Sequence, residues 1–150
     1  MRNFLLFLII GIFALSCKET STTAPVSVAA APVDSLISNW CKTWSSNDSA
    51  GVSSMFTSAA LVIDDQYIFN GKATIDSGWI HRNLPFVKNM TAQKLQEWYS
   101  GDHAGYVGTY QFDLTIKDTV RSQQKGAFSV NWVREEKGDW KVVSATIHSF

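Results

Sequence analysis

Two hydrophobic patterns divide the chain into a helical first part and a β-rich second part. Apolar residues recur at helical spacing over residues 33–46, which predicts an amphipathic helix. A short second helix follows, with Asp48 or Ser49 as its cap, and residues 72–83 show helical spacing again. The apolar stripe of the first helix consists of Val33, Leu36, Ile37, Trp40 and Trp44.

Alternation of apolar and polar residues predicts strands in most of the remaining chain. The clearest case is residues 104–117, where Tyr106, Tyr110 and Phe112 share one face. The predicted strands cover residues 59–64, 67–69, 90–99, 104–117, 126–134 and 140–150. Because helices come first and turn-linked strands follow, the pattern predicts an α+β fold, with helices packed on one face of a strongly curved antiparallel sheet.

The N-terminus carries an apolar run of a different kind. Residues 4–13 are apolar, Arg2 precedes them, and Ala14-Leu15-Ser16-Cys17 follows. The run is too short for an ordinary membrane span, so residues 1–16 are predicted to be a cleaved export signal. Its end resembles the bacterial lipoprotein box. That resemblance implies a lipid on Cys17 and a membrane-anchored protein in the cell envelope, at the outer membrane or the periplasmic face.

The segment after Cys17 separates this signal from the periodic part of the chain. Residues 17–32 are rich in Thr, Ser, Ala and Pro and are predicted to form a flexible tether. The alternative is a first ordered strand through Val26 and Val28. Residues 33–150 are then expected to form one domain.

Charge and cysteine content narrow the classes of function. The chain has 13 Lys and Arg against 13 Asp and Glu, and it has no basic cluster, which argues against nucleic-acid binding. With Cys17 lipidated, Cys41 has no disulfide partner and is expected at the edge of the core. The three histidines are far apart, and no phosphate loop or dinucleotide motif is present, so neither a metal nor a cofactor is expected.

Several weak motifs follow one another along the predicted domain. They include the aromatic helix with Trp40 and Trp44, the passage from Ala60 to Asp64, and Gly138-Asp139-Trp140-Lys141-Val142-Val143 near the end. In this order they resemble the nuclear transport factor 2-like superfamily and, within it, the SnoaL-like group. The resemblance implies a cone-shaped, cystatin-like fold with a pocket at its open end. Its members include isomerases, dehydratases, cyclases and non-catalytic modules, so the fold does not decide function.

Asp64 is the candidate catalytic residue. The spacing Ala60-x-Val62-x-Asp64 resembles the passage in which ketosteroid-isomerase relatives place their general base. Alternatively, Asp64 and Asp65 simply end a strand and begin a turn. In those relatives a first-helix tyrosine and a strand carboxyl donate to the oxyanion. This chain has Trp40 at the helix position and Val130-Asn131-Trp132 around the strand position, so the acid is missing.

Aromatic residues and one histidine are the candidate ligand-binding residues: Trp40, Tyr110, Trp132 and His148. The aromatics either line an apolar pocket or form the core. His148 is expected to share a strand face with Val142, Ser144 and Thr146, or else to be an exposed histidine near the C-terminus. The favoured hypothesis is an exported, membrane-anchored domain that binds a small apolar ligand or a partner protein without catalysis. The alternatives are an isomerase or lyase with Asp64 as general base, and a homodimeric assembly module.

Overall fold

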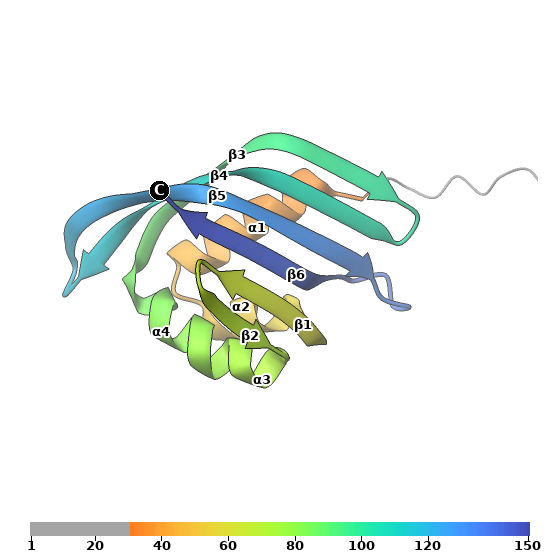
Figure 1. Cartoon of the computed structure of the whole chain (residues 1–150), viewed down its shortest axis with the longest axis horizontal. Helices are drawn as coiled ribbons and strands as arrows, with labels where there is room; N and C mark the ends of the chain where they lie inside the picture. Colours follow the sequence, from red (N-terminus) through yellow and green to blue (C-terminus); the bar gives the residue numbers. More distant parts are fainter. Residues whose placement is uncertain (1–30) are drawn as a thin grey trace, which may run out of the picture.

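The computed structural model describes residues 31–150, which form six strands and several helices (Figure 1). The predicted signal, Cys17 and nearly all of the predicted tether lie outside the described residues. The helical segments are α1 (Val33–Ser45), α2 (Ser49–Ser54), α3 (Lys72–Thr74), the π-helix η1 (Ile75–Ile80), α4 (His81–Asn83) and the 3₁₀-helix η2 (Leu84–Phe86). The strands are β1 (Phe56–Asp64), β2 (Tyr67–Asn70), β3 (Val87–Ser100), β4 (His103–Ile116), β5 (Thr119–Arg134) and β6 (Trp140–Ser149).

The strands form one curled, mixed sheet in the order β2-β1-β6-β5-β4-β3. The predicted α+β class is confirmed, but the sheet is not wholly antiparallel. Strands β1 and β6 run parallel, with Phe56 opposite Val142 and Asp64 opposite Ile147. The strand pattern alone could not show this, because a parallel pair needs no hairpin and joins segments that are far apart in the chain.

The β4–β5 hairpin extends beyond the rest of the sheet (Figure 1). Its two-residue turn, Lys117-Asp118, has positive φ angles of 50° and 57°, as tight hairpin turns that match the strand twist require. The sequence predicts that the second strand of this hairpin begins at residue 126, whereas β5 begins at Thr119. Apart from Val120, the residues of β5 up to Lys125 are polar, so they lack the alternation that reveals a half-buried strand.

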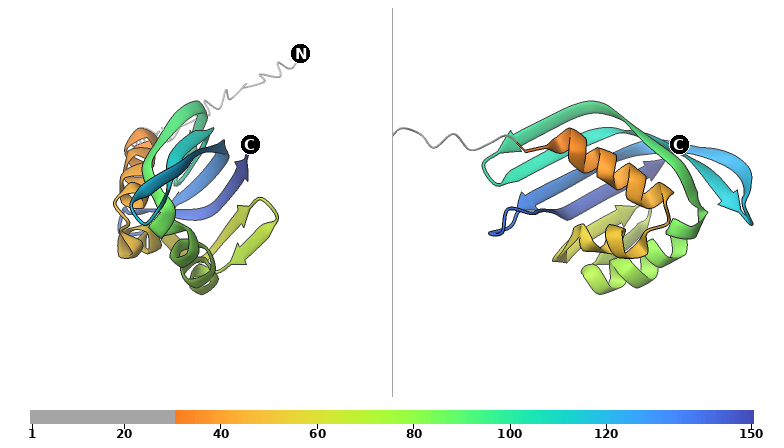
Figure 2. Two further views of the ribbon diagram at one scale, coloured as in Figure 1. Left: turned by 90° about the vertical axis from the view of Figure 1, so that its left-hand side faces the viewer. Right: turned by 180° about the vertical axis from the view of Figure 1, so that it is seen from behind.

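Irregularities in two strands help to bend the sheet around α1. In β3 the register shifts between Lys88 and Thr91, where Asn89 has a φ of 51°. In β6 the register shifts at Val143, because Trp132 lies opposite Val142 while Asn131 lies opposite Ser144. Such bulges bend and twist a strand. The views in Figure 2 show α1 lying along the inner face of the bent sheet, where the residues Val33, Ile37, Trp40 and Trp44 of its predicted stripe are buried.

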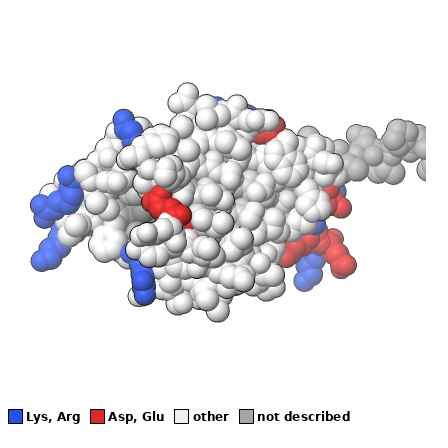
Figure 3. Space-filling model, viewed as in Figure 1, with Lys and Arg blue, Asp and Glu red and all other residues white. Residues whose placement is uncertain are grey.

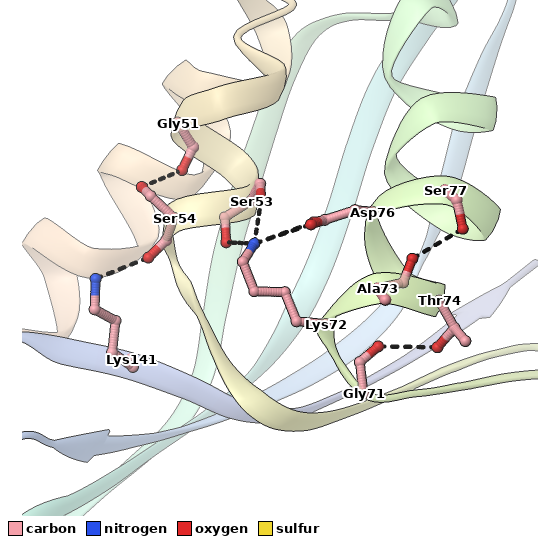
Figure 4. Close-up of polar contacts among 10 residues, drawn as sticks. All are labelled: Gly51, Ser53, Ser54, Gly71, Lys72, Ala73, Thr74, Asp76, Ser77 and Lys141. Atoms are coloured by element: carbon pink, nitrogen blue, oxygen red, sulfur yellow. Dashed lines mark hydrogen bonds and ion pairs between the residues drawn. The ribbon is translucent and has the colours of Figure 1, made fainter.

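A network of polar contacts joins α2 to the start of the helical segment over residues 72–86 and to β6 (Figure 4). The Lys72 ammonium donates to the Ser53 carbonyl at 2.7 Å and to the Ser53 hydroxyl, and it pairs with Asp76 at 3.1 Å. Lys141 Nζ of β6 donates to the Ser54 carbonyl at 2.8 Å. These contacts link α2 to α3 and to β6, and they fix the start of the helix that carries Trp79. Among residues 31–150, no helix is both long and apolar enough to span a membrane.

Candidate functional site

A cavity of about 390 Å³ opens between the inner face of the sheet, the β1–β2 turn and the helix running through η1 and α4. A volume of this size is typical of small-molecule sites. Its wall is mainly aromatic and aliphatic, and its charged residues are Asp64, Asp65 and Arg82. The aromatic lining residues are Trp40, Trp44, Tyr67, Phe69, Trp79, Phe86, Tyr110, Phe112 and Phe128.

The alternation along β1 brings Asp64 into this cavity. Ala60 and Val62 are fully buried on the inner face, and Asp64 follows them at the same two-residue period. The Asp64 carboxylate is half-buried. Its Oδ2 accepts a hydrogen bond of 2.8 Å from the indole nitrogen of Trp79, a buried residue of η1. The carboxylate is therefore held in position from the helical side of the cavity.

Burial of Asp64 raises the pKa of its carboxyl above the ordinary value. Desolvation is the main cause, because removal from water disfavours the charged form. The Trp79 hydrogen bond acts in the opposite direction and lowers the pKa, while the negative charge of Asp65 raises it further. Asp64 thus has the environment of a carboxyl that can exchange protons or hydrogen bonds with a bound molecule.

The neighbouring carboxylate, Asp65, has the opposite environment. Asp65 is exposed at the β1–β2 turn, with a φ of 50°. Its Oδ1 accepts the backbone N–H of Ser149 at 3.0 Å and lies 2.9 Å from Nδ1 of His148. The pKa of Asp65 is lowered, foremost by the Ser149 backbone hydrogen bond. The pKa of Asp64 is therefore raised while that of the adjacent Asp65 is lowered. Such a difference between neighbouring carboxyls is common where one of them has a chemical role.

Strand β4 contributes a phenol to the same cavity. Tyr110 is buried on the inner face, and its hydroxyl lies 3.3 Å from the hydroxyl of Ser149. Burial is the main cause of a raised Tyr110 pKa, and the charge of Asp64 contributes to the shift. The phenol is thus a neutral hydrogen-bond donor or acceptor in the cavity that also holds Asp64.

Trp79 lies in a π-helical segment between two short α-helical turns. Such segments inside α-helices occur frequently at functional sites. Trp79 packs edge-on against Trp44, with ring centroids 4.8 Å apart. The indole N–H groups of Trp40 and Trp44 are buried without a hydrogen-bond partner in the described part of the chain, whereas that of Trp79 meets Asp64.

The structure brings three of the predicted site residues together and separates two others from them. Asp64, Trp40 and Tyr110 all line the cavity. Trp132 is buried in the core and does not line it. His148 is exposed and lies beside Asp65 instead of lining the cavity.

The bulge in β6 explains the position of His148. One of the two predictions for His148 placed it on a strand face with Val142 by strict alternation, and the structure agrees with the other, an exposed histidine near the C-terminus. The register shift at Val143 instead buries Val142 with Ala145, and it leaves Thr146 and His148 exposed. The residues of β6 that line the cavity are Ile147 and Ser149.

Other cavity residues were not singled out from the sequence. Trp79 and Arg82 fall within the helix predicted over residues 72–83, and Ser149 falls within the last predicted strand, without a predicted role in the site. Helical spacing could locate Trp79 on the inward side, but no local pattern indicates that its N–H meets a carboxylate fifteen residues earlier. Within residues 31–150, no group of three or more His, Cys, Asp or Glu is placed to hold a metal ion.

Figure 3 shows the side of the molecule that is seen in Figure 1. Most of this surface is uncharged, and an acidic group lies near its middle, in the region of the β1–β2 turn. Basic side chains gather toward the end formed by the β4–β5 hairpin, whose sequence contains Lys117, Arg121 and Lys125. The aromatic cavity is therefore the feature best suited to bind a small molecule.

Comparisons with known proteins identify the architecture. No family model matches the sequence, and no curated protein does. Solved structures do match. A nuclear transport factor 2-like superfamily protein from Salmonella enterica is 13% identical with a TM-score of 0.67, over 78% of this chain and 87% of that one. A ketosteroid isomerase-like protein from Erwinia carotovora is 12% identical with a TM-score of 0.68, over 79% and 93%.

A third structure is similar to a comparable extent. It is a nuclear transport factor 2-like protein with a cystatin-like fold from Novosphingobium aromaticivorans, 15% identical with a TM-score of 0.60, over 77% of each chain. At these identities the likeness concerns the fold. The resemblance noted in the sequence is thereby confirmed at this level, and the described chain has the nuclear transport factor 2-like, cystatin-like fold.

Proposed function

We propose that this domain binds a small, largely apolar molecule in its aromatic cavity and holds it by a hydrogen bond to Asp64. The single observation that carries the proposal is the half-buried Asp64 carboxylate in a cavity walled mainly by aromatic rings. Ligand sites commonly combine apolar walls with a few polar groups that fix orientation. Here Asp64, Tyr110 and Ser149 are those polar groups.

A binding experiment with the full chain in lipid nanodiscs tests this proposal. The probe is 4-tert-butylphenol, a compact apolar molecule with one hydroxyl, measured by isothermal titration calorimetry against empty nanodiscs. We expect saturable binding that Phe112→Ala weakens at least about fivefold, because that ring lines the cavity. The control is Trp98→Ala, which removes an exposed aromatic outside the cavity. Equal affinities in both variants would contradict the proposal.

A second candidate function is proton transfer by Asp64 in an isomerase or lyase reaction. It is favoured by the raised pKa of Asp64 together with a neutral phenol, Tyr110, in the same cavity. A general base needs such a partner to stabilise the developing oxyanion. One neighbour in fold is also described as ketosteroid isomerase-like. Turnover of an enolisable ketone that Asp64→Asn abolishes, with the fold intact, would select this function over binding alone.

We also propose that the domain acts at a membrane surface in the cell envelope, anchored by a lipid on Cys17. The support is the short apolar N-terminal run that ends in Ala14-Leu15-Ser16-Cys17. Mass spectrometry of the N-terminal peptide should find cleavage before Cys17 and acyl chains on it. The variant Cys17→Ser should lose the acyl chains. An unmodified Cys17 in a membrane fraction would contradict the proposed anchor.

A further inference from the structure

The strongest unexplained feature of the cavity is the missing countercharge of Asp64. Among residues 31–150, no Lys, Arg or His forms an ion pair with Asp64, although the other carboxylate at the cavity, Asp65, lies against His148. The hydrogen bond to Asp64 comes from the neutral Trp79. A carboxylate taken out of water is costly unless it is paired with a cation, so the protein itself leaves this cost partly uncompensated.

Aromatic rings line the same cavity as this carboxylate. Trp79 donates its indole N–H to it, and Tyr110 of β4 and Phe128 of the neighbouring strand β5 have ring centroids 5.9 Å apart. All three line the cavity. The face of an aromatic ring attracts a cation, and the attraction is larger where the cation is shielded from water. The wall and the carboxylate therefore favour the same sign of charge in a ligand.

We propose that the molecule bound in this cavity is an organic cation, an apolar or aromatic body bearing one ammonium group that faces Asp64. This inference rests on the proposed binding function and names its ligand class. The ammonium supplies the countercharge that the described residues do not place on Asp64. The apolar body then fills the cavity beside Tyr110 and Phe128.

The remaining charges at the cavity are compatible with this assignment. Arg82 of α4 also lines the cavity. It is exposed to solvent and forms no ion pair with Asp64. Asp65 adds a second negative charge at the opening. An anionic ligand would have to place its charge near Asp64, which has no ion-pair partner among residues 31–150, and near Asp65, which already lies against His148. A cation meets the opposite charge of Asp64 directly.

A matched pair of probes isolates the effect of the positive charge. The compounds are (4-hydroxyphenyl)trimethylammonium and 4-tert-butylphenol, which have nearly the same shape and the same hydroxyl but differ by one charge. Binding to the full chain in zwitterionic nanodiscs is measured by calorimetry, with empty nanodiscs as the blank. We expect the cation to bind about tenfold more tightly than the neutral probe or better.

Two variants locate the source of that preference. Asp64→Asn should abolish the preference for the cation, because it weakens binding of the cation about tenfold more than binding of the neutral probe, which loses only a hydrogen bond to the carboxylate. Asp65→Asn removes the same charge from a carboxylate that is exposed and already hydrogen-bonded, so it should reduce the preference much less. An equal loss in both variants would overturn the assigned contact with Asp64. Thermal unfolding of each variant checks that the fold is retained.

The outcomes separate failure of this inference from failure of the binding function. If 4-tert-butylphenol binds as tightly as the cation, the cavity binds ligands but the inference is overturned. If the cation is preferred and the preference depends on Asp64, both are supported. If neither probe binds the unmodified chain at millimolar concentration, the proposed function fails and this inference fails with it.

Discussion

The inner face of the sheet has a packed half and an open half, although both are rich in aromatic residues. In the packed half Tyr106 and Trp132 are buried in the core. In the open half Tyr110 and Phe112 line the cavity. The difference lies in what covers each half, since the sheet and the residue types are the same.

This contrast assigns stability to one half and binding to the other. Where aromatic side chains are fully enclosed, their removal leaves a cavity that the fold cannot fill. Where they already border an open space, their removal mainly changes the shape of that space. The following predictions test this division, from the largest expected effect to the smallest.

The packed half should be the more sensitive to truncation. Trp132 is 3% exposed, so Trp132→Ala is expected to lower the free energy of unfolding by about 3–5 kcal/mol. Chemical denaturation followed by circular dichroism measures this loss. Trp98→Ala is the control, because Trp98 is 43% exposed and should cost much less. Equal losses in the two variants would contradict the assignment of Trp132 to the packed half.

The second largest loss of stability is expected from removing the hydrogen bond between Trp79 and Asp64. Trp79→Phe removes the donor at 2.8 Å and keeps most of the ring, so it should lower the free energy of unfolding by about 1.5–3 kcal/mol at neutral pH. The pKa of Asp64 should rise further, because the Trp79 hydrogen bond lowers it in the intact protein. NMR titration of the Asp64 side-chain carbon would measure the change. An unchanged titration would show that this bond does not act on Asp64.

Truncating an aromatic side chain in the open half should change stability little but should weaken ligand binding. Phe112 is only partly buried and stacks on Tyr110 with ring centroids 6.0 Å apart. We expect Phe112→Ala to lower the free energy of unfolding by about 1 kcal/mol. The same variant should weaken binding of an apolar probe. Trp132→Ala should instead lower the free energy of unfolding strongly and leave the affinity for the probe nearly unchanged. If Phe112→Ala proves as destabilising as Trp132→Ala, the two halves do not differ as described.

Asp64 should reduce stability at neutral pH, the opposite of a typical surface carboxylate. Its folded-state pKa is raised, so between the unfolded and folded pKa values the folded state binds more protons. Stability therefore falls as pH increases through that window. Asp64→Asn should remove this fall and leave the protein more stable above the window. Unfolding of both proteins from pH 3 to pH 8 would test this, and parallel curves would contradict a raised pKa.

Which residues face the interior could largely be predicted from the sequence, because this follows from local periodicity. The spacing of Val33, Ile37 and Trp40 identified the buried stripe of α1, and the alternation through Tyr106 and Tyr110 identified the inner face of β4. Asp48 does cap α2, with its side chain accepting the N–H of Gly51. These features depend on neighbouring residues only.

What the sequence could not show depends on register and on distant segments. Trp132 and Tyr110 have the same alternating pattern and are both buried, but only Tyr110 lines the cavity, whose other walls come from distant segments. His148 was placed by strict alternation, which the bulge at Val143 interrupts. Trp79 and Asp64 meet because a π-helical turn lies opposite the end of β1, and no short motif indicates that meeting.

The most direct test of the account is an NMR titration of the tryptophan indole N–H signals. The chain has 6 tryptophans, which lie in both halves of the inner face and elsewhere, and each signal can be assigned with a Trp→Phe variant. On addition of 4-tert-butylphenol to the full chain, the Trp79 signal should shift in a saturable way, while the Trp98 and Trp132 signals remain in place. Shifts at Trp98 or Trp132 without a shift at Trp79 would contradict ligand binding in the open half.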